Sequence, residues 1–300
     1  MITSRQRRML LSVPGRTMLE RWMHSGVSIS MMSVTCCLAF LAGPPVRAAA
    51  GSGLEEAGSR QTNVPPLNAS YAPPPESAGA LAGISFSGQN IGGKFLSRFA
   101  ECDAHDKCDG KTVKYPCSTD RNENTALMRL KNGVVFFDGK MGVDADGSPY
   151  AKAHRDKINQ DDTSLRYPLK GDLSLNADRV PFVVIPMGGF AEELGVELGD
   201  VVAVIWKSKR VFALIGDAGP PCKIGEGSIA LHEALGHAVC LQRSSTGDCE
   251  ELRDVSIDKH VLYFIFPHTR AQIYPGLTPD NVGQRMESIG AKAWAGLAGE

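Results

Sequence analysis

Five short apolar runs, all after residue 130, limit the folds that this chain can adopt. They are rich in Val, Ile and Phe, and each ends next to Gly, Pro, Asp or Lys. Such runs are typical of buried strands, since a buried helix needs a longer apolar pattern. We therefore expect a mainly β fold with a few helices. The runs are Val134–Phe137, Val180–Ile185, Val201–Trp206, Val211–Ile215 and Val261–Phe266.

Two stretches have helical periodicity instead. The first helix is expected over about 226–241, where apolar residues form one stripe. The second is expected in a C-terminal helical segment, 269–300, where Thr278 can cap the helix and Pro279 fits its first turn. Its apolar residues from Val282 to Leu297 repeat at helical spacing. The stripe of the first helix comprises Leu231, Ala234, Leu235, Ala238 and Val239.

The first 83 residues differ from the rest of the chain. Residues 1–50 place arginines before an apolar run, Val27–Gly43, and end in the small-residue site Val46–Ala50. This order predicts a secretory signal. A transmembrane anchor is the alternative, but the run is short and contains Ser and Thr, which disfavours a stable span. Residues 51–83 are rich in Gly, Ser, Ala and Pro, as in a linker, which leaves 84–268 as the main folded domain.

Charge and cysteine content narrow the class of protein further. Without residues 1–50, the chain has 26 basic and 32 acidic residues, a formal net charge of −6. This balance argues against nucleic acid as a partner. Six cysteines remain, an even number that suggests disulfides in a secreted or periplasmic protein. We expect one pair among the first three, one among the last three and one bridge between the groups. The cysteines are Cys102, Cys108, Cys117, Cys222, Cys240 and Cys249.

His232, Glu233 and His237 resemble the helix of a zinc protease, but the spacing differs. That motif needs its two histidines at positions i and i+4. Here the second follows at i+5, which turns it by about 140° on a regular helix. We therefore expect no metal site, and interpret the histidines as part of a polar helix surface.

Asp217 and Glu226 each lie beside glycines, in GDAGP and GEG. Asp217 follows an expected strand, and Glu226 falls at the expected start of a helix, where the dipole stabilises a carboxylate. An Asx turn and an ordinary first-turn acid are the structural alternatives. Asp144 and Asp146 occupy a D-x-D-G turn that lacks the third ligand and the distal Glu of an EF-hand. A plain surface turn is equally compatible with that pattern.

Four segments resemble the fungal-type chitosanases of glycoside hydrolase family 75, which also has bacterial members. They are FFDGKMGVDADGSP (136–149), VPFVVIP (180–186), GVELGDVVAVIWKSKRVFALIGDAGP (195–220) and KIGEGSIALHEALG (223–236). The four segments occur in the same order as in the family, and the block from GD-x-GP to GE-x-S is the part of the resemblance that is most specific to it. Two departures are the missing cysteine in the aspartate motif and Cys222 between the two acids.

The resemblance implies a secreted endo-acting hydrolase that cleaves the β-1,4 linkages of chitosan with inversion, without a cofactor. The family's essential Asp and Glu lie nine positions apart, as Asp217 and Glu226 do, with Glu226 as general acid and Asp217 as general base. Asp144 and Asp146 are then expected to bind the protonated amines of the polysaccharide, with Lys140 near the acids. The strand before the GD-x-GP turn resembles double-psi β-barrels, so we expect a double-psi-like catalytic domain.

Two other functions stay open at this point. One is hydrolysis of another amino-sugar polymer, such as peptidoglycan or partly acetylated chitin. The other is a non-catalytic carbohydrate-binding protein of the cell envelope. We further expect a monomer whose partner is its polysaccharide, with no stable membrane association once the signal is removed.

Overall fold

The computed structural model describes residues 69–117, 126–155, 159–171, 173–253 and 255–299. The expected secretory signal lies outside these residues. Among the described residues, none of the helices combines the length and the apolar content needed to cross a membrane.

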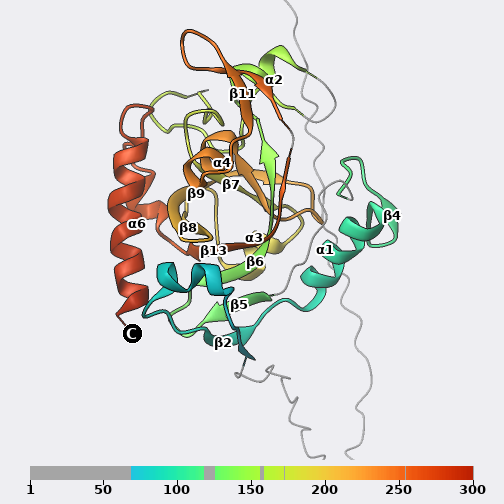
Figure 1. The fold of residues 1–300 in the computed structure, drawn as a ribbon, viewed down its shortest axis with the longest axis vertical. Coiled ribbons are helices and arrows are strands. Elements are labelled where there is room, and N and C mark those ends of the chain that lie inside the picture. Colours follow the sequence, from blue (N-terminus) through green and yellow to red (C-terminus); the bar gives the residue numbers. More distant parts are fainter. Residues whose placement is uncertain (1–68, 118–125, 156–158, 172, 254, 300) are drawn as a thin grey trace, which may run out of the picture. The chain divides into compact units, whose positions relative to one another are not determined.

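Six strands of the largest sheet close into a barrel (Figure 1). The last strand of the ring, β13, pairs back to the first, β6. The pairs β6–β10 and β7–β9 are parallel, and the other neighbours in the ring are antiparallel. The expected mainly β fold with a closed barrel is confirmed. In ring order the strands are β6 (Val135–Asp144), β10 (Glu226–Ser228), β7 (Phe182–Pro186), β9 (Lys209–Gly219), β8 (Val201–Trp206) and β13 (Ile257–Phe266).

Each of the five apolar runs lies wholly or mostly in a barrel strand, which confirms the strands expected there. Alternate residues of these strands enter two different apolar clusters, as the two faces of a strand require. On β8, Ala203 packs in the cluster that includes α6 (Val282–Ala298), and Val204 packs with α1 (Gly93–His105) and α4 (Ile229–Leu235). Strands β8 and β9 form a hairpin, in which Trp206 pairs with Lys209 across a two-residue turn.

The sheet continues beyond the barrel toward the N-terminus. Strand β5 (Ala126–Leu130) joins β6 to β2 (Ser87–Asn90), which pairs with β1 (Ala69–Ser70). A 3-10 helix, Pro75–Leu81, follows β1 and buries Leu81 in the cluster of α6. Residues 69–83 were expected to be linker, but their aromatic and apolar side chains pack on the barrel: the Tyr71 ring lies 4.9 Å from Phe136.

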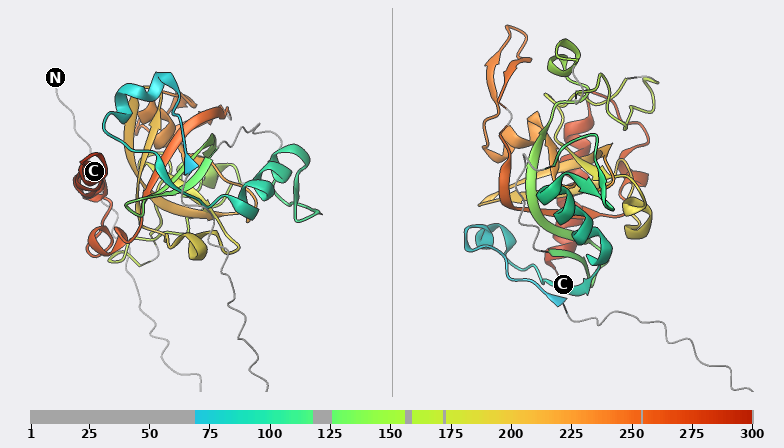
Figure 2. Two further views of the ribbon diagram at one scale, coloured as in Figure 1. Left: turned by 90° about the horizontal axis from the view of Figure 1, so that it is seen from below. Right: turned by 90° about the vertical axis from the view of Figure 1, so that its right-hand side faces the viewer.

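Helix α6 confirms the helix expected at the C-terminal end. The helix starts at Val282 and not at the expected cap, Thr278. Thr278 instead begins a preceding turn, in which its N–H donates to Asn281 Oδ1. Trp294 of α6 packs edge-on against Phe264 of β13, at 5.2 Å between ring centroids. Helices α6 and α1 lie on opposite sides of the barrel (Figures 1 and 2). The other helices are α2 (Pro149–Ala153), α3 (Phe190–Leu194) and α5 (Arg270–Ile273).

The described residues contain three disulfides, arranged as expected. Cys102–Cys117 joins two of the first three cysteines, Cys240–Cys249 joins two of the last three, and Cys108–Cys222 connects the groups. Cys240–Cys249 joins the first residues of the paired strands β11 (Cys240–Arg243) and β12 (Cys249–Leu252). Cys108–Cys222 ties the hairpin of β3 (Lys107–Cys108) and β4 (Lys111–Thr112) to the loop before Glu226, and Cys102–Cys117 ties the segment after the hairpin to α1.

Candidate functional site

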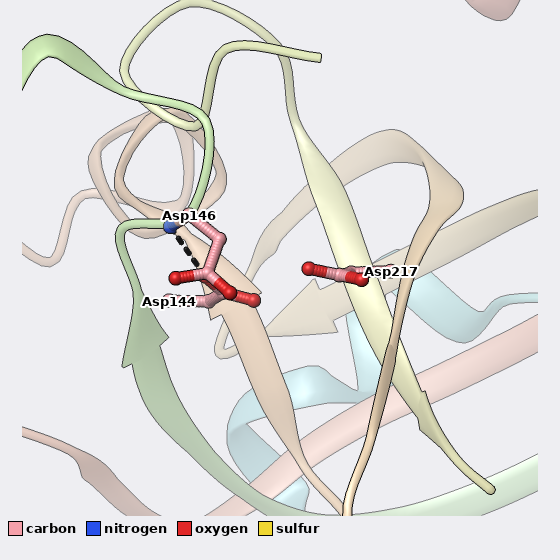
Figure 3. A group of neighbouring side chains, drawn as sticks. All are labelled: Asp144, Asp146 and Asp217. Carbon is pink, nitrogen blue, oxygen red and sulfur yellow. Dashed lines mark hydrogen bonds between the residues drawn. The ribbon is translucent and has the colours of Figure 1, made fainter. Parts of the chain in front are cut away.

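Asp144 and Asp146 lie where β6 ends and turns away from the barrel. The Asp146 N–H donates to Asp144 Oδ1 at 2.7 Å, which closes the turn (Figure 3). Gly147 has φ +77°, and a Cβ there would lie 2.0 Å from the Leu175 carbonyl oxygen, so only glycine fits. Asp146 Oδ1 accepts the Gln160 N–H at 2.7 Å, which ties the turn to a segment 14 residues later.

Asp217 lies inside strand β9, and its carboxylate points toward the Asp144–Asp146 turn (Figure 3). The sequence predicted a turn beyond the strand instead. Strand β9 continues beyond Asp217, because its register against β7 shifts by one residue at Gly216. This β-bulge redirects the Asp217 side chain. Asp217 Oδ1 accepts three bonds: from Ser164 N at 2.9 Å, from Ser164 Oγ at 2.5 Å and from Ala218 N at 2.7 Å.

Glu226 is the first residue of β10, a three-residue strand, and not part of a helix as expected. The helix α4 starts only after Ser228, whose hydroxyl caps it by accepting Leu231 N at 3.2 Å. Lys223 Nζ lies 2.9 Å from Glu226 Oε1. The carboxylate is therefore held by an ion pair from its own loop.

The register of three neighbouring strands brings the two acids together. Val184 of β7 is opposite Glu226 of β10 on one side and opposite Asp217 of β9 on the other. Two strand spacings separate the two acids, so their Cα atoms lie about 9–10 Å apart. Side chains in one such row share a face of the sheet, and both acids face the same hollow.

That hollow has a volume of about 320 Å³, within the range of small-ligand sites. The charged side chains of its lining are four acids and one lysine, and the lining also includes one aromatic ring. The charged and aromatic residues of the lining are Tyr115, Asp144, Asp146, Asp217, Lys223 and Glu226. The turn aspartates and the acid pair, 71 or more residues apart in the sequence, therefore form one acidic cleft.

Burial and mutual repulsion raise the pKa values of three of these acids. Burial, opposed by the Gln160 N–H donor and helped by the charges of Asp217 and Glu226, raises the pKa of Asp146 to about 7. For Asp144, burial and then the charge of Asp146 hold the pKa well above its usual range. Burial also raises the pKa of Asp217, although its hydrogen bonds from Ser164 and Ala218 lower it. Such a cluster favours either bound protons or a bound cation.

One oxygen each of Asp144, Asp146 and Asp217 lies within 4.8 Å of the others, close enough for the three to hold a cation. A family described as fungal chitosanase of glycosyl hydrolase group 75 matches residues 141–290. The chain belongs to this family. Searching the curated proteins gave no match.

The match makes the protein a glycoside hydrolase of a chitosan-degrading family, and it contains all four acids of the cleft. Glycoside hydrolases generally work with two carboxyl groups that flank the scissile bond. The acidic cleft of this chitosanase-family protein contains four carboxyl groups. Residues before 141, including the whole disulfide-held β3–β4 hairpin, lie outside the matched region.

Lys140 is not part of the cleft of this family member. Its side chain is fully buried, and Nζ lies 2.5 Å from Asp103 Oδ1 on α1. A buried lysine needs such a partner, because an isolated buried charge is costly. The sequence offered a contact with the acids or a solvated lysine, and the structure shows neither; Lys140 connects β6 to α1.

His232 and His237 do contact each other, contrary to the helix argument. The helix α4 ends at Leu235, and Gly236 adopts φ +89°, so His237 turns back toward His232. Their Nδ1 atoms are 2.9 Å apart, and His232 Nε2 lies 2.9 Å from the Gly142 carbonyl oxygen. A carbonyl accepts only, so His232 carries its proton on Nε2 and accepts from His237. Burial and the charges of Arg253 and Lys207 lower the pKa of His237, which favours this neutral pair.

Sequence reasoning missed Ser164 and Lys223. Ser164 contacts Asp217 across 53 positions, so no local pattern could reveal it. Lys223 was visible three residues before Glu226, at a spacing that allows an ion pair within one loop. Tyr115 and Gln160 also line the cleft, from segments in which no motif was recognised.

The unliganded hydrolase should lose stability as the pH rises from about 4 to about 7. A carboxyl whose folded pKa is raised binds its proton more tightly in the folded state. Its stabilising contribution is complete below the unfolded pKa of about 4 and disappears as the pH passes the folded pKa. For Asp146, with a pKa of about 7, the free energy of unfolding should fall by up to about 4 kcal/mol over this range.

Urea titrations of the wild type and of Asp146→Asn between pH 4 and pH 8 test this. The variant has no carboxyl at this position to titrate, so its free energy of unfolding should vary less over this range. Parallel pH profiles for the two proteins would contradict the expectation.

Proposed function

We propose that this protein is a secreted, endo-acting chitosanase that hydrolyses β-1,4 bonds between glucosamine units with inversion. The observation that carries the proposal is the row Asp217–Val184–Glu226, which presents two carboxyl groups to one cleft from strands two apart. Inverting glycosidases separate their carboxyl groups by about 6.5–9.5 Å, whereas retaining enzymes need about 5–5.5 Å. A spacing of two strands supports the wider geometry.

In the proposed reaction Glu226 donates a proton to the glycosidic oxygen that leaves. A water molecule attacks the anomeric carbon from the opposite face, and Asp217 accepts the proton of that water. Three donors fix Asp217 Oδ1, which leaves Oδ2 to act as the base. A base whose pKa is raised toward the working pH is more effective. Lys223 stabilises the Glu226 carboxylate that remains after the proton has left.

Asp144 and Asp146 would bind the protonated amines of the chain. Burial raises their pKa values most and the like charges of neighbouring acids add to the rise, so an ammonium group between them relieves the repulsion. A groove lined by carboxylates also concentrates a polycation near its surface. This gives the turn aspartates a role in binding the substrate that is separate from bond cleavage.

Asp144→Asn and Asp146→Asn should therefore raise KM more than they lower kcat. A hydrogen bond to a charged group contributes about 1.5–3 kcal/mol, so KM for chitosan should rise about tenfold or more. Loss of binding that is equal in ground and transition states leaves kcat nearly unchanged. Steady-state kinetics on soluble chitosan measures both constants. A collapse of kcat at constant KM in Asp144→Asn would instead make Asp144 the base.

Export and a monomeric state are part of the same proposal. Three disulfides support an oxidising compartment, either outside the cell or in the periplasm. The order of basic, apolar and small residues over 1–50 supports a cleaved signal. Among the described residues, the large apolar side chains that are exposed are few, which supports a monomer. They are Leu169, Leu173, Met187 and Leu241.

Release of reducing ends from chitosan and from peptidoglycan tests the proposal. Chitosan should release them and peptidoglycan should not, and treatment with EDTA should leave the rate unchanged. Release from peptidoglycan or acetylated chitin alone would indicate another amino-sugar polymer. Binding of chitosan without release of ends would indicate a carbohydrate-binding protein. Activity lost with EDTA and restored by zinc or calcium would show that the three aspartates hold a metal.

A further inference from the structure

The cleft continues past Tyr115 into a second hollow of about 900 Å³. Tyr115, Gln160 and the segment from Asp217 to Pro220 line both hollows, so the two adjoin at Asp217, while Glu226 lines the acidic hollow alone. A polysaccharide that crosses the acids therefore extends into the second hollow on one side of the cleaved bond. The sugar unit there contacts different side chains from the unit in the acidic hollow.

The two hollows differ in their balance of charges. The acidic hollow is lined by four acids and one lysine, whereas the three acids of the second hollow, Asp161, Asp162 and Asp217, are matched in number by Lys111, Lys114 and Arg166. In the second hollow, Asp162 is paired with Arg166 at 3.2 Å, and Asp161 is paired with Arg155 at 2.7 Å. Lys111 and Lys114 add two positive charges beyond these pairs. Lys114 Nζ lies 4.8 Å from the centroid of the Tyr115 ring, at the boundary between the hollows.

The wall that carries these lysines is fixed in place. It is the segment from Lys107 to Cys117, which includes the β3–β4 hairpin. Cys102–Cys117 ties it to α1, and Cys108–Cys222 ties it to the loop between Asp217 and Glu226. A wall bridged to that loop keeps a constant position relative to the reacting bond.

The second hollow also offers apolar surface. Met187 is 52% exposed, which is unusual for a large apolar side chain, and it lies in this hollow with Val113 and Pro221. An acetamido group brings a methyl group and no charge. A protonated amine brings a charge that the two lysines repel and that the apolar side chains cannot solvate.

We propose that the wall from Lys107 to Cys117 forms a subsite for an N-acetylated glucosamine unit, and that Lys111 and Lys114 disfavour a protonated unit there. This inference rests on the proposed function, since it assigns the side of the cleaved bond on which acetylation is accepted. The acidic hollow takes the cationic unit, and the hollow beyond Tyr115 takes the neutral one. The protein then acts most readily at the junction between a deacetylated and an acetylated unit.

The test compares the wild type with the double variant Lys111→Glu and Lys114→Glu. Wild-type kcat/KM should be about 3–10-fold higher on partly acetylated chitosan than on fully deacetylated chitosan, as expected for two partly screened charges. The double variant should lose this preference and act faster on the deacetylated polymer. Lys131→Glu with Lys292→Glu is the matched control, because both lysines are exposed, lie outside both hollows and change the net charge equally. The control should keep the wild-type preference.

Hydrolysis in H₂¹⁸O labels the new reducing end, so mass spectrometry can assign the acetyl groups to the two new ends. Wild-type products should carry them mainly at one end, and the double variant should distribute them more evenly. Equal acetylation of both ends in the wild type, or an unchanged bias in the double variant, would overturn the subsite. Calorimetric binding of acetylated and deacetylated oligomers tests it independently of turnover. A Lys-dependent preference in binding without hydrolysis would refute the proposed function and leave the subsite in place; no such preference would refute the subsite.

Discussion

Replacing Glu226 with Gln should slow the hydrolysis of chitosan by about 10²–10⁴-fold, the usual contribution of a positioned acid. Glutamine has nearly the same size and can still accept a hydrogen bond from Lys223, but it has no proton to donate to the leaving oxygen. Asp217→Asn should be slow to a similar degree, because an amide cannot accept the proton of the attacking water. Initial rates of reducing-end release measure both effects.

Neither substitution should unfold the protein, because neither removes apolar side chains from the barrel. Urea titration of each variant checks this, and Glu192→Gln, an exposed acid on α3, is the matched control that should keep full activity. Full activity in Glu226→Gln or in Asp217→Asn would show that the pair is not the catalytic pair.

A substrate with a good leaving group separates the two roles. A β-glycosyl fluoride of a glucosamine oligomer needs no proton on the leaving atom. Glu226→Gln should therefore hydrolyse it at nearly the wild-type rate, whereas Asp217→Asn should stay slow; the reverse pattern would exchange acid and base. Proton NMR of the first product from chitosan should show the α-anomer, since a single displacement inverts the β-linkage. A β-anomer would mean a retaining mechanism.

The strands of the barrel could be predicted because the signal for each is local. A short run such as Val201–Trp206 is apolar on both faces, and both faces are buried in the structure. The ring closure between β13 and β6 is not local, since it joins residues such as Ile265 and Val135 that lie 130 positions apart. A closed barrel could be expected only from the resemblance of the GD-x-GP block to barrel proteins.

The acid pair could be located from the sequence, but its setting could not. Glu226 belongs to a three-residue strand that exists only because Gly142 and Val184 flank it. The bulge at Gly216 that redirects Asp217 likewise depends on its partner strand. The burial of Lys140 depends on Asp103, 37 positions away. The helix expected over about 226–241 also proved too long, because α4 ends at Leu235 and Gly236 adopts φ +89°, a common helix terminator.

Removing the Cys108–Cys222 bridge should destabilise the protein more than removing Cys240–Cys249. A disulfide lowers the entropy of the unfolded chain, and the effect grows with the number of residues that it encloses. The first bridge spans 114 positions and the second spans 9. The chain-entropy relation gives about 4–5 kcal/mol for the first and about 2–3 kcal/mol for the second.

Urea titrations of the double variants Cys108→Ser with Cys222→Ser and Cys240→Ser with Cys249→Ser measure the difference. The pairs are well matched, because each has one buried cysteine, Cys222 at 1% and Cys249 at 2% exposure, and one half-buried partner. The cost of burying a serine hydroxyl should therefore nearly cancel between them. Equal losses would show that local packing, and not loop closure, sets the contribution of each bridge. Because Cys222 lies between Asp217 and Glu226, the first variant should also raise KM for chitosan, whereas the second should leave it unchanged.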